Sequence, residues 1–429
     1  MPNSSPNESR QPSTAPANSS GFLSVALCCL AAVCEGFDLQ SPGVTARAVS
    51  SVFGMNAGQT GLFLSISTFG MMLGALLGGR LSDKIGRKWV LIGSIALFSA
   101  CTAGTALATS HTMLLSIRFA TGIGLGGALP NLVAIAVESV AHERRSTAVG
   151  VMLMGPPIGG ALVSLLAAAF ATPDRWQVLY LAGGFGPLAI VVPLLIAFLP
   201  NRRIVRTPDT AKSPDGARTT WAVLFGDGRG ARTIAVWLGL FSILWALFVL
   251  AGWLPTLMVD RGLTGPQASF VQTAFNLSAI PGSLFAGLVL DFALRRRATL
   301  ALGTVFVVAM GAIVLLANGP VSLGMMLIGG ALAGLAVMAG QVMIYALAPN
   351  VYPSAGRGTG VGFAVAVGRF GSAGGPLLTG YLVAFGLNSS QMLLALLPVA
   401  ALAGTAALYL AGAIGRERRA QSELARSSA

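Results

Sequence analysis

Two acidic residues, Glu35 and Asp38, lie within a long apolar run between Phe22 and Ala46. No Lys or Arg occurs between positions 11 and 46, so the run offers neither carboxylate a cationic partner. In a membrane helix, a spacing of three residues places both acids on one face. An ionised carboxylate is costly in hydrocarbon, so it must face a polar cavity or a partner. We predict that these acids mark an ion or substrate path; the alternative is a structural pair that ties helices together.

Two arginines also fall inside apolar runs. Arg369 lies 12 residues after Arg357, about 18 Å along a helix and so near mid-bilayer. A guanidinium at that depth needs an anion, which is either a structural acid from another helix or a substrate carboxylate. We predict the substrate, because no other acid lies at mid-depth in the second half. Arg118 can lie level with Glu35 and Asp38, and a charged set of this kind is sufficient for proton coupling.

The composition predicts a membrane protein that carries these residues. The chain is 54% hydrophobic and 10% charged, with a mean hydropathy of +0.77, whereas soluble domains have roughly 25% charged residues. The length accommodates about a dozen spans of roughly 20 residues. The apolar runs place them at 22–46, 58–79, 89–109, 113–138, 147–171, 177–199, 233–257, 267–290, 299–317, 322–347, 358–386 and 390–412.

The net charge of +13 is a topology signal and does not indicate nucleic acid. With the N-terminus inside, nearly all Lys and Arg residues fall on the cytoplasmic side, and only Arg47, Arg175 and Arg261 fall outside. This asymmetry places both termini in the cytoplasm. The expected segments are a disordered tail (1–21), a six-helix bundle (22–199), a linker (200–232), a second six-helix bundle (233–412) and a C-terminal tail (413–429).

A loop after the second span carries the most specific motif. It reads Gly79-Arg-Leu-Ser-Asp83-Lys-Ile-Gly86-Arg87-Lys88. The spacing G-x-x-x-D-K-x-G-R-K resembles the signature loop of the major facilitator superfamily. A degenerate copy, ending in Asp291 and followed by three arginines, occurs half a chain later, as a parallel repeat requires. We expect both loops to act in conformational gating.

Three further segments carry predictions. Gly155-Pro156-Pro157 predicts a kink in the fifth span, and it resembles a motif associated with antiporters. Trp253, at the outer end of the seventh span, is expected to anchor in the headgroup region. Gln341 and Tyr345 are four residues apart and therefore share one helix face.

The segments EGFDLQSPG, RFATGIGLGGALPN, MGPPIGG and GQVMIYALAPNVYPSAGRGTGVGFAVAVGRFGSAGGP resemble the aromatic acid–proton symporter family, and are most similar to its hydroxyphenylpropionate branch. That family implicates an acidic pair in transport, which falls on Glu35 and Asp38. Many members have two aspartates there, so Glu35 departs from the commoner form but agrees with this branch. The resemblance implies uptake of an aromatic carboxylate with protons. We assign substrate binding to Arg369, Arg118, Gln341, Tyr345 and Asn131, and add Arg357, Gly155 and Pro156 to the gate.

The expected protein is a monomeric alternating-access carrier in a bacterial inner membrane, with twelve helices in two bundles. No G-x-x-x-x-G-K-[ST] loop is present, so we expect an ion gradient as the energy source and no cofactor. His111 and His142 cluster with neither acids nor cysteines, and the Cys residues lack metal spacing, so neither a metal site nor enzyme chemistry is expected. A proton-driven efflux antiporter remains the alternative. A chemoreceptor would need a signalling domain, for which the linker and tails leave no room.

Overall fold

The computed structural model describes residues 19–427, except 142–143, 200–219, 293–294 and 354–355. The described part is helical throughout. Its helices are α1 (Ser19–Phe53), α2 (Ala57–Ile85), α3 (Arg87–Thr105), α4 (His111–Glu138), α5 (Arg145–Leu153), α6 (Gly155–Phe170), α7 (Gln177–Gly186), a π-helix η2 (Pro187–Val191), α8 (Val192–Phe198), α9 (Thr220–Phe225), α10 (Gly230–Asp260), α11 (Gly265–Phe292), α12 (Arg295–Asn318), α13 (Leu323–Leu347), a 3-10 turn η4 (Ala348–Asn350), α14 (Arg357–Ala384), α15 (Ser389–Leu394) and α16 (Leu396–Ser427).

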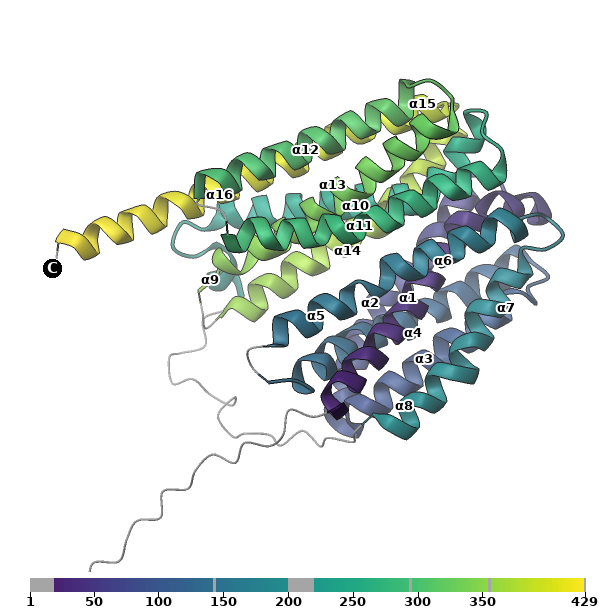
Figure 1. Cartoon of the computed structure of the whole chain (residues 1–429), viewed down its shortest axis with the longest axis horizontal. Coiled ribbons are helices and arrows are strands. Elements are labelled where there is room, and N and C mark those ends of the chain that lie inside the picture. The colour runs from purple at the N-terminus through teal and green to yellow at the C-terminus, as the bar shows by residue number, and fades with distance from the viewer. Residues whose placement is uncertain (1–18, 142–143, 200–219, 293–294, 354–355, 428–429) are drawn as a thin grey trace, which may run out of the picture.

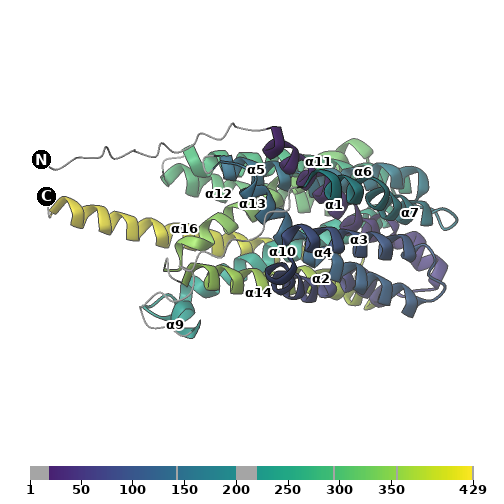
Figure 2. The ribbon, with the colours of Figure 1, turned by 90° about the horizontal axis from the view of Figure 1, so that it is seen from below.

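The helices form two bundles that lie side by side, α1–α8 in one and α10–α16 in the other (Figure 1). The start of α1 and the end of α16 lie at the same end of the molecule, which we call the terminal end (Figure 2). The opposite end, where α1 and α10 finish at Phe53 and Asp260, is called the distal end. Depth in the molecule is described between these two ends.

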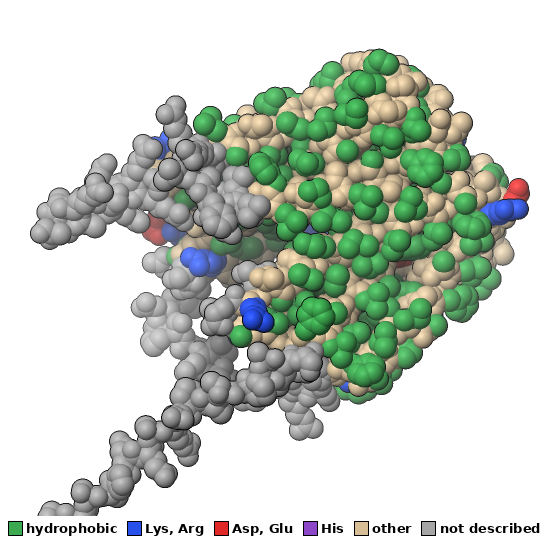
Figure 3. All heavy atoms as spheres, in the orientation of Figure 1, with side chains coloured by type: hydrophobic (Ala, Val, Ile, Leu, Met, Phe, Trp, Pro, Cys, Tyr) green, Lys and Arg blue, Asp and Glu red, His purple; other side chains and the backbone are tan. Residues whose placement is uncertain are grey.

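The flank of the molecule is suited to lipid. Hydrophobic side chains cover the visible flank, and charged side chains lie toward its ends (Figure 3). Within the described residues, 11 helical segments are long and apolar enough to cross a membrane. The 28-residue helix α11 lies at the eighth predicted span, 267–290. The chain is therefore a multi-pass membrane protein.

Two of the predicted spans are interrupted in the structure. The fifth predicted span is broken between α5 and α6, because Pro156 and Pro157 lack the N–H groups needed to continue the ladder. The sixth changes to a π-helix that begins at Pro187, an interruption that we did not predict. The helix α9 falls inside the predicted linker, and α16 continues through most of the predicted C-terminal tail.

The two bundles share apolar core only toward the distal end. The core of the second bundle continues into Phe63, Leu114 and Trp176 of the first. Residues nearer the terminal end of the first bundle, such as Leu27 and Leu132, belong to a separate core cluster. The described structure is therefore closed at the distal end, with the bundle cores separate toward the terminal end.

Polar and backbone contacts reinforce the distal closure. Arg47 forms an ion pair with Asp260 across the bundle boundary. Gly43 lies so near α10 that a Cβ atom there would overlap the carbonyl oxygen of Ala251. The prediction for Trp253 is wrong: its side chain is buried, and Nε1 donates to the Pro376 carbonyl oxygen at 3.0 Å. The indole is enclosed because the bundles meet there, and it ties α10 to α14.

Candidate functional site

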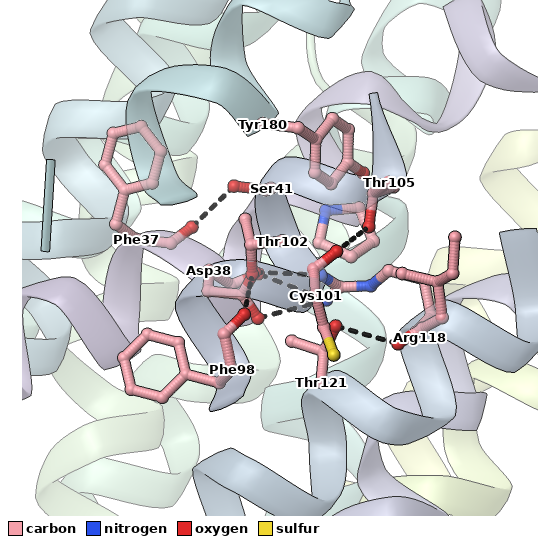
Figure 4. Close-up of polar contacts among 12 residues, drawn as sticks. Phe37, Asp38, Ser41, Phe98, Cys101, Thr102, Thr105, Arg118, Thr121 and Tyr180 are labelled. Atoms are coloured by element: carbon pink, nitrogen blue, oxygen red, sulfur yellow. Dashed lines mark hydrogen bonds and ion pairs between the residues drawn. The ribbon is translucent and has the colours of Figure 1, made fainter. Parts of the chain in front are cut away.

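A buried ion pair between Asp38 of α1 and Arg118 of α4 forms the centre of the first bundle (Figure 4). Arg118 Nη1 donates to Asp38 Oδ1 at 2.8 Å, and Nη2 donates to Oδ2 at 3.2 Å. Both side chains have 0% exposure. The predicted proximity of Arg118 to the acids of α1 is therefore confirmed. Such a pair is strongly coupled, because removing one partner leaves the other charge buried and uncompensated.

Pro42 adds a backbone contact to this pair. In an α-helix, residue 42 would donate its N–H to the carbonyl of residue 38, and proline has no N–H. The freed carbonyl oxygen of Asp38 receives Arg118 Nη2 at 3.4 Å. Arg118 therefore holds both the side chain and the backbone of Asp38. The signal for this contact, a proline four residues after the acid, was present in the sequence and was not used.

Hydroxyl groups complete the surroundings of the pair. Thr102 Oγ1 on α3 lies 2.5 Å from Asp38 Oδ1. The Arg118 guanidinium carbon lies 5.8 Å from the centre of the Tyr180 ring, and the Tyr180 hydroxyl lies 2.9 Å from Thr45 Oγ1. The Nε atom of Arg118 is buried without a hydrogen-bond partner. The site thus holds a carboxylate with several hydrogen-bond donors in a buried pocket.

Close helix packing positions α1 against α6. A Cβ atom on Gly36 would overlap the backbone of Pro156, so glycine is required where the helices cross. Gly155 and Pro156, two of the predicted gate residues, therefore lie against the segment that carries both acids. The break between α5 and α6 therefore lies in direct contact with α1.

Glu35 faces a different cation. Its side chain is 2% exposed, and Oε2 is buried without a hydrogen-bond partner. The charge of Arg369 on α14 acts on this carboxyl, and so does that of Asp38. Arg369 therefore interacts with an acid, and this acid comes from the other bundle. Among the described residues, no ion pair within 4.0 Å closes on Arg369.

Two other predicted substrate residues lie near Arg369 on the second bundle. Tyr345 on α13 is subject to the charge of Arg369. Gln341 lies one turn away on the same face, and its Oε1 is buried without a partner. Asn131 lies elsewhere, buried in the first bundle with Nδ2 donating to the Gly127 carbonyl oxygen of its own helix at 2.8 Å. Electrostatic interactions thus link Arg369 to Glu35 and Tyr345, and Gln341 lies one turn from Tyr345, whereas Asn131 bonds within its own helix.

An amide cluster joins the bundles toward the distal end, and the sequence analysis missed it. Gln40 Nε2 donates to Asn276 Oδ1 at 2.7 Å, and Asn276 Nδ2 donates to Gln40 Oε1 at 2.8 Å. Gln272 Nε2 donates to Gln40 Oε1 at 3.1 Å, while Gln272 Oε1 has no partner. Because Gln40 follows Asp38 by two residues, α1 connects this cluster to the ion pair.

The signature loop joins α2 to α3 at the terminal end. Gly86 has a φ of +93°, a conformation that favours glycine and allows the tight reversal between the two helices. Arg87 forms an ion pair with Glu138, and Lys88 Nζ donates to the Ile196 carbonyl oxygen at 2.9 Å. Gly79 lies on α2, and Arg357 begins α14 with an exposed side chain. The side chains of Asp83 and Asp291 lie outside the described residues, so their predicted gating roles stay predictions. No cluster of His, Cys, Asp or Glu suited to a metal occurs in the described part of the chain.

Two stretches of the chain, residues 28–265 and 236–428, match the family described as the Major Facilitator Superfamily. The chain belongs to this superfamily. Its membership, with the helical structure above, confirms the predicted twelve-helix fold in two bundles. It also confirms the predicted class, a transporter and not an enzyme.

Relatives and solved structures agree with this assignment. The chain is 39% identical to the 3-(3-hydroxy-phenyl)propionate transporter of Escherichia coli, over 91% of this chain and 94% of the relative. It is 32% identical to the 4-hydroxybenzoate transporter PcaK of Pseudomonas putida, over 88% and 90%. These relatives bear out the resemblance to the aromatic acid family. The D-xylose-proton symporter matches with a TM-score of 0.72 and 19% identity, covering 91% of this chain and 97% of that chain.

Proposed function

We propose that this protein imports a hydroxylated aromatic carboxylate, of the 3-(3-hydroxyphenyl)propionate kind, together with protons. It works as a monomer in a bacterial inner membrane. The positions of Lys and Arg support cytoplasmic termini, so the distal end faces outward. The names of the relatives support the substrate class. Transport requires alternating access, in which the distal contacts open as the terminal side closes.

The observation that carries this proposal is the difference between the two membrane arginines. Arg118 is enclosed and paired with an acid of its own bundle. Arg369 is partly exposed on the other bundle, near Glu35 but without an ion pair among the described residues. A guanidinium with free donors offers a planar fork that matches a carboxylate. Arg369 is therefore the better substrate ligand, and a substrate reaches Arg118 only if its pair with Asp38 opens.

The groups near Arg369 suit the rest of the substrate. With the carboxylate on Arg369, the unpartnered Oε1 of Gln341 can accept a hydrogen bond from a ring hydroxyl. Tyr345 supplies an aromatic surface beside Arg369. The Oε1 atom of Gln341 gains a hydrogen-bond donor only when the ring carries a hydroxyl group. A hydroxylated ring should therefore bind better than an unsubstituted one.

Proton coupling follows from the two acids. An ionised Glu35 competes with the substrate carboxylate for Arg369, so substrate binding favours protonated Glu35. Protonation of Asp38 removes the charge that holds Arg118, which loosens α1 from α4. Each acid therefore links proton occupancy to a different contact, one across the bundles and one within the first bundle.

The test is uptake of radiolabelled aromatic acids by purified protein in liposomes, with an imposed pH gradient and with a protonophore. We expect inward accumulation of hydroxylated acids that collapses with the protonophore. The efflux alternative predicts the opposite direction: protons leaving the proton-rich side would drive the acid into that side. Accumulation that persists without a proton gradient would exclude proton coupling.

A further inference from the structure

The hydroxyl group of Thr102 has one hydrogen but two acceptor oxygens within hydrogen-bond distance. Its Oγ1 lies 2.5 Å from Asp38 Oδ1 and 2.7 Å from the Phe98 carbonyl oxygen (Figure 4). A threonine hydroxyl donates one hydrogen and accepts through its lone pairs. It can therefore donate to only one of these oxygens at a time.

The protonation state of Asp38 decides which oxygen receives the hydrogen. An ionised carboxylate is the stronger acceptor, so Thr102 donates to it. When Asp38 carries a proton, its own O–H can donate to Thr102 Oγ1. The Thr102 hydrogen then turns to the Phe98 carbonyl, the usual back-bond of a threonine within a helix. Neither arrangement leaves a buried polar atom of this contact unpaired.

We propose that Thr102 is a two-position hydrogen-bond switch that accommodates the buried Asp38 both with and without its proton. The proposal rests on the proposed proton coupling through Asp38. Thr102 is a positioning residue, because it acts through Asp38. Its switch allows Arg118 to separate from a protonated Asp38 without leaving the carboxyl group unpaired.

The other groups that face Asp38 do not offer this exchange. Arg118 only donates, and the Tyr180 hydroxyl pairs with Thr45. Cys101 on α3 and Glu35 on α1 interact with Asp38 electrostatically, and no hydrogen bond joins either to it among the described contacts. The helix α6 also packs on α1 and carries no titratable side chain, while the charged residues of α10 lie near its two ends.

The test is an infrared titration of the reconstituted protein, in which the carboxylic acid band of Asp38 is assigned by its loss in Asp38→Asn. Thr102→Val removes a charge-assisted hydrogen bond to ionised Asp38 and a neutral hydrogen bond to protonated Asp38. Because the charge-assisted bond is stronger, the variant destabilises the ionised form more. The pH midpoint of the Asp38 band should therefore move upward by roughly half to one pH unit. The pH profile of uptake should move with it, and Thr102→Ser should restore both.

Thr105→Val is the matched control. Thr105 is also buried on α3 and donates to the carbonyl of residue 101 at 3.0 Å, one turn from Thr102. Its loss should leave the midpoint unchanged. If Thr102→Val lowers uptake equally at every pH with an unchanged midpoint, Thr102 is merely structural and the switch is rejected. If the Asp38 band does not titrate in the wild type, proton coupling through Asp38 fails instead.

Discussion

Arg118 and Arg369 place the same side chain in two unlike settings. Arg118 is fully enclosed, and Asp38 engages both of its terminal nitrogens within one bundle. Arg369 is partly exposed where the bundles face each other, and the nearby acid Glu35 comes from the opposite bundle. A guanidinium that is already paired with a carboxylate loses that pair when the carboxylate is protonated. A guanidinium with free donors can instead bind an incoming anion. This difference supports the proposed roles: Asp38 responds to protons through its pair with Arg118, and Arg369 binds the substrate carboxylate in competition with Glu35.

Neutralising Asp38 should have the largest effect on these roles. Asp38→Asn keeps the side-chain shape, but its amide cannot take up and release a proton as the carboxyl group does. Accumulation driven by a pH gradient should therefore be abolished. Exchange of labelled for unlabelled substrate at equal pH should continue if the fold persists. Full gradient-driven accumulation by the variant would remove Asp38 from the coupling mechanism.

Removing Arg369 should weaken binding strongly. Arg369→Ala should cost on the order of 2–5 kcal/mol, as for truncating one partner of a buried charge pair. Arg369→Lys keeps the charge but lacks the planar fork, so it should bind with intermediate affinity. Calorimetric titration in detergent measures both. An aromatic alcohol without the carboxylate serves as the control, since neither change should affect its weak binding. Wild-type affinity in the alanine variant would mean that another group holds the carboxylate.

Glu35→Gln tests the competition at Arg369. The change removes the charge that competes with the substrate, so affinity at alkaline pH should rise by roughly tenfold, or about 1.4 kcal/mol. The pH dependence of affinity should flatten, and proton-driven accumulation should fall. An affinity that still varies with pH as in the wild type would assign the competition to another group.

The amide cluster of Gln40 and Asn276 should have a smaller effect, on conformation. Asn276→Ala removes both hydrogen bonds to Gln40, each worth about 0.5–1.5 kcal/mol, so distal opening should increase about fivefold or more. The measurement is maleimide labelling of Val49→Cys, a position buried in the distal core, in a background without the native cysteines. Gln40→Ala should give a similar increase, and the double variant should add little. Fully additive effects would mean that the two amides act independently.

The smallest effect on affinity is expected far from both arginines. Asp83→Asn, in the last turn of α2 at the terminal end, should slow transport and leave substrate affinity in detergent nearly unchanged. Its distance from the proposed site is roughly half a bilayer. Uptake rate and calorimetry on the same preparation separate the two quantities. A parallel loss of binding would place Asp83 in the substrate site.

The broad architecture could be predicted from the amino-acid sequence. Long apolar runs, basic loops and the repeated signature motif have few interpretations, because every backbone polar group in lipid must be satisfied within a helix. The same reasoning identified the two acids of α1 and the two membrane arginines, since charges in such runs are costly without a function. Pro156 and Pro157 likewise predicted a kink in the fifth span from their missing N–H groups, and the structure has a break between α5 and α6 there.

The partner of each charged side chain could be seen only in the folded structure. Glu35 and Asp38 share one helix, yet one lies near Arg369 of the opposite bundle and the other pairs with Arg118. Helix periodicity gives the face of a residue but not the helix that packs against it, because contacts between distant segments depend on the rotation and crossing of whole bundles. Gln40 and Asn276 meet 236 positions apart for the same reason, and no local pattern in the sequence marks either as the partner of the other.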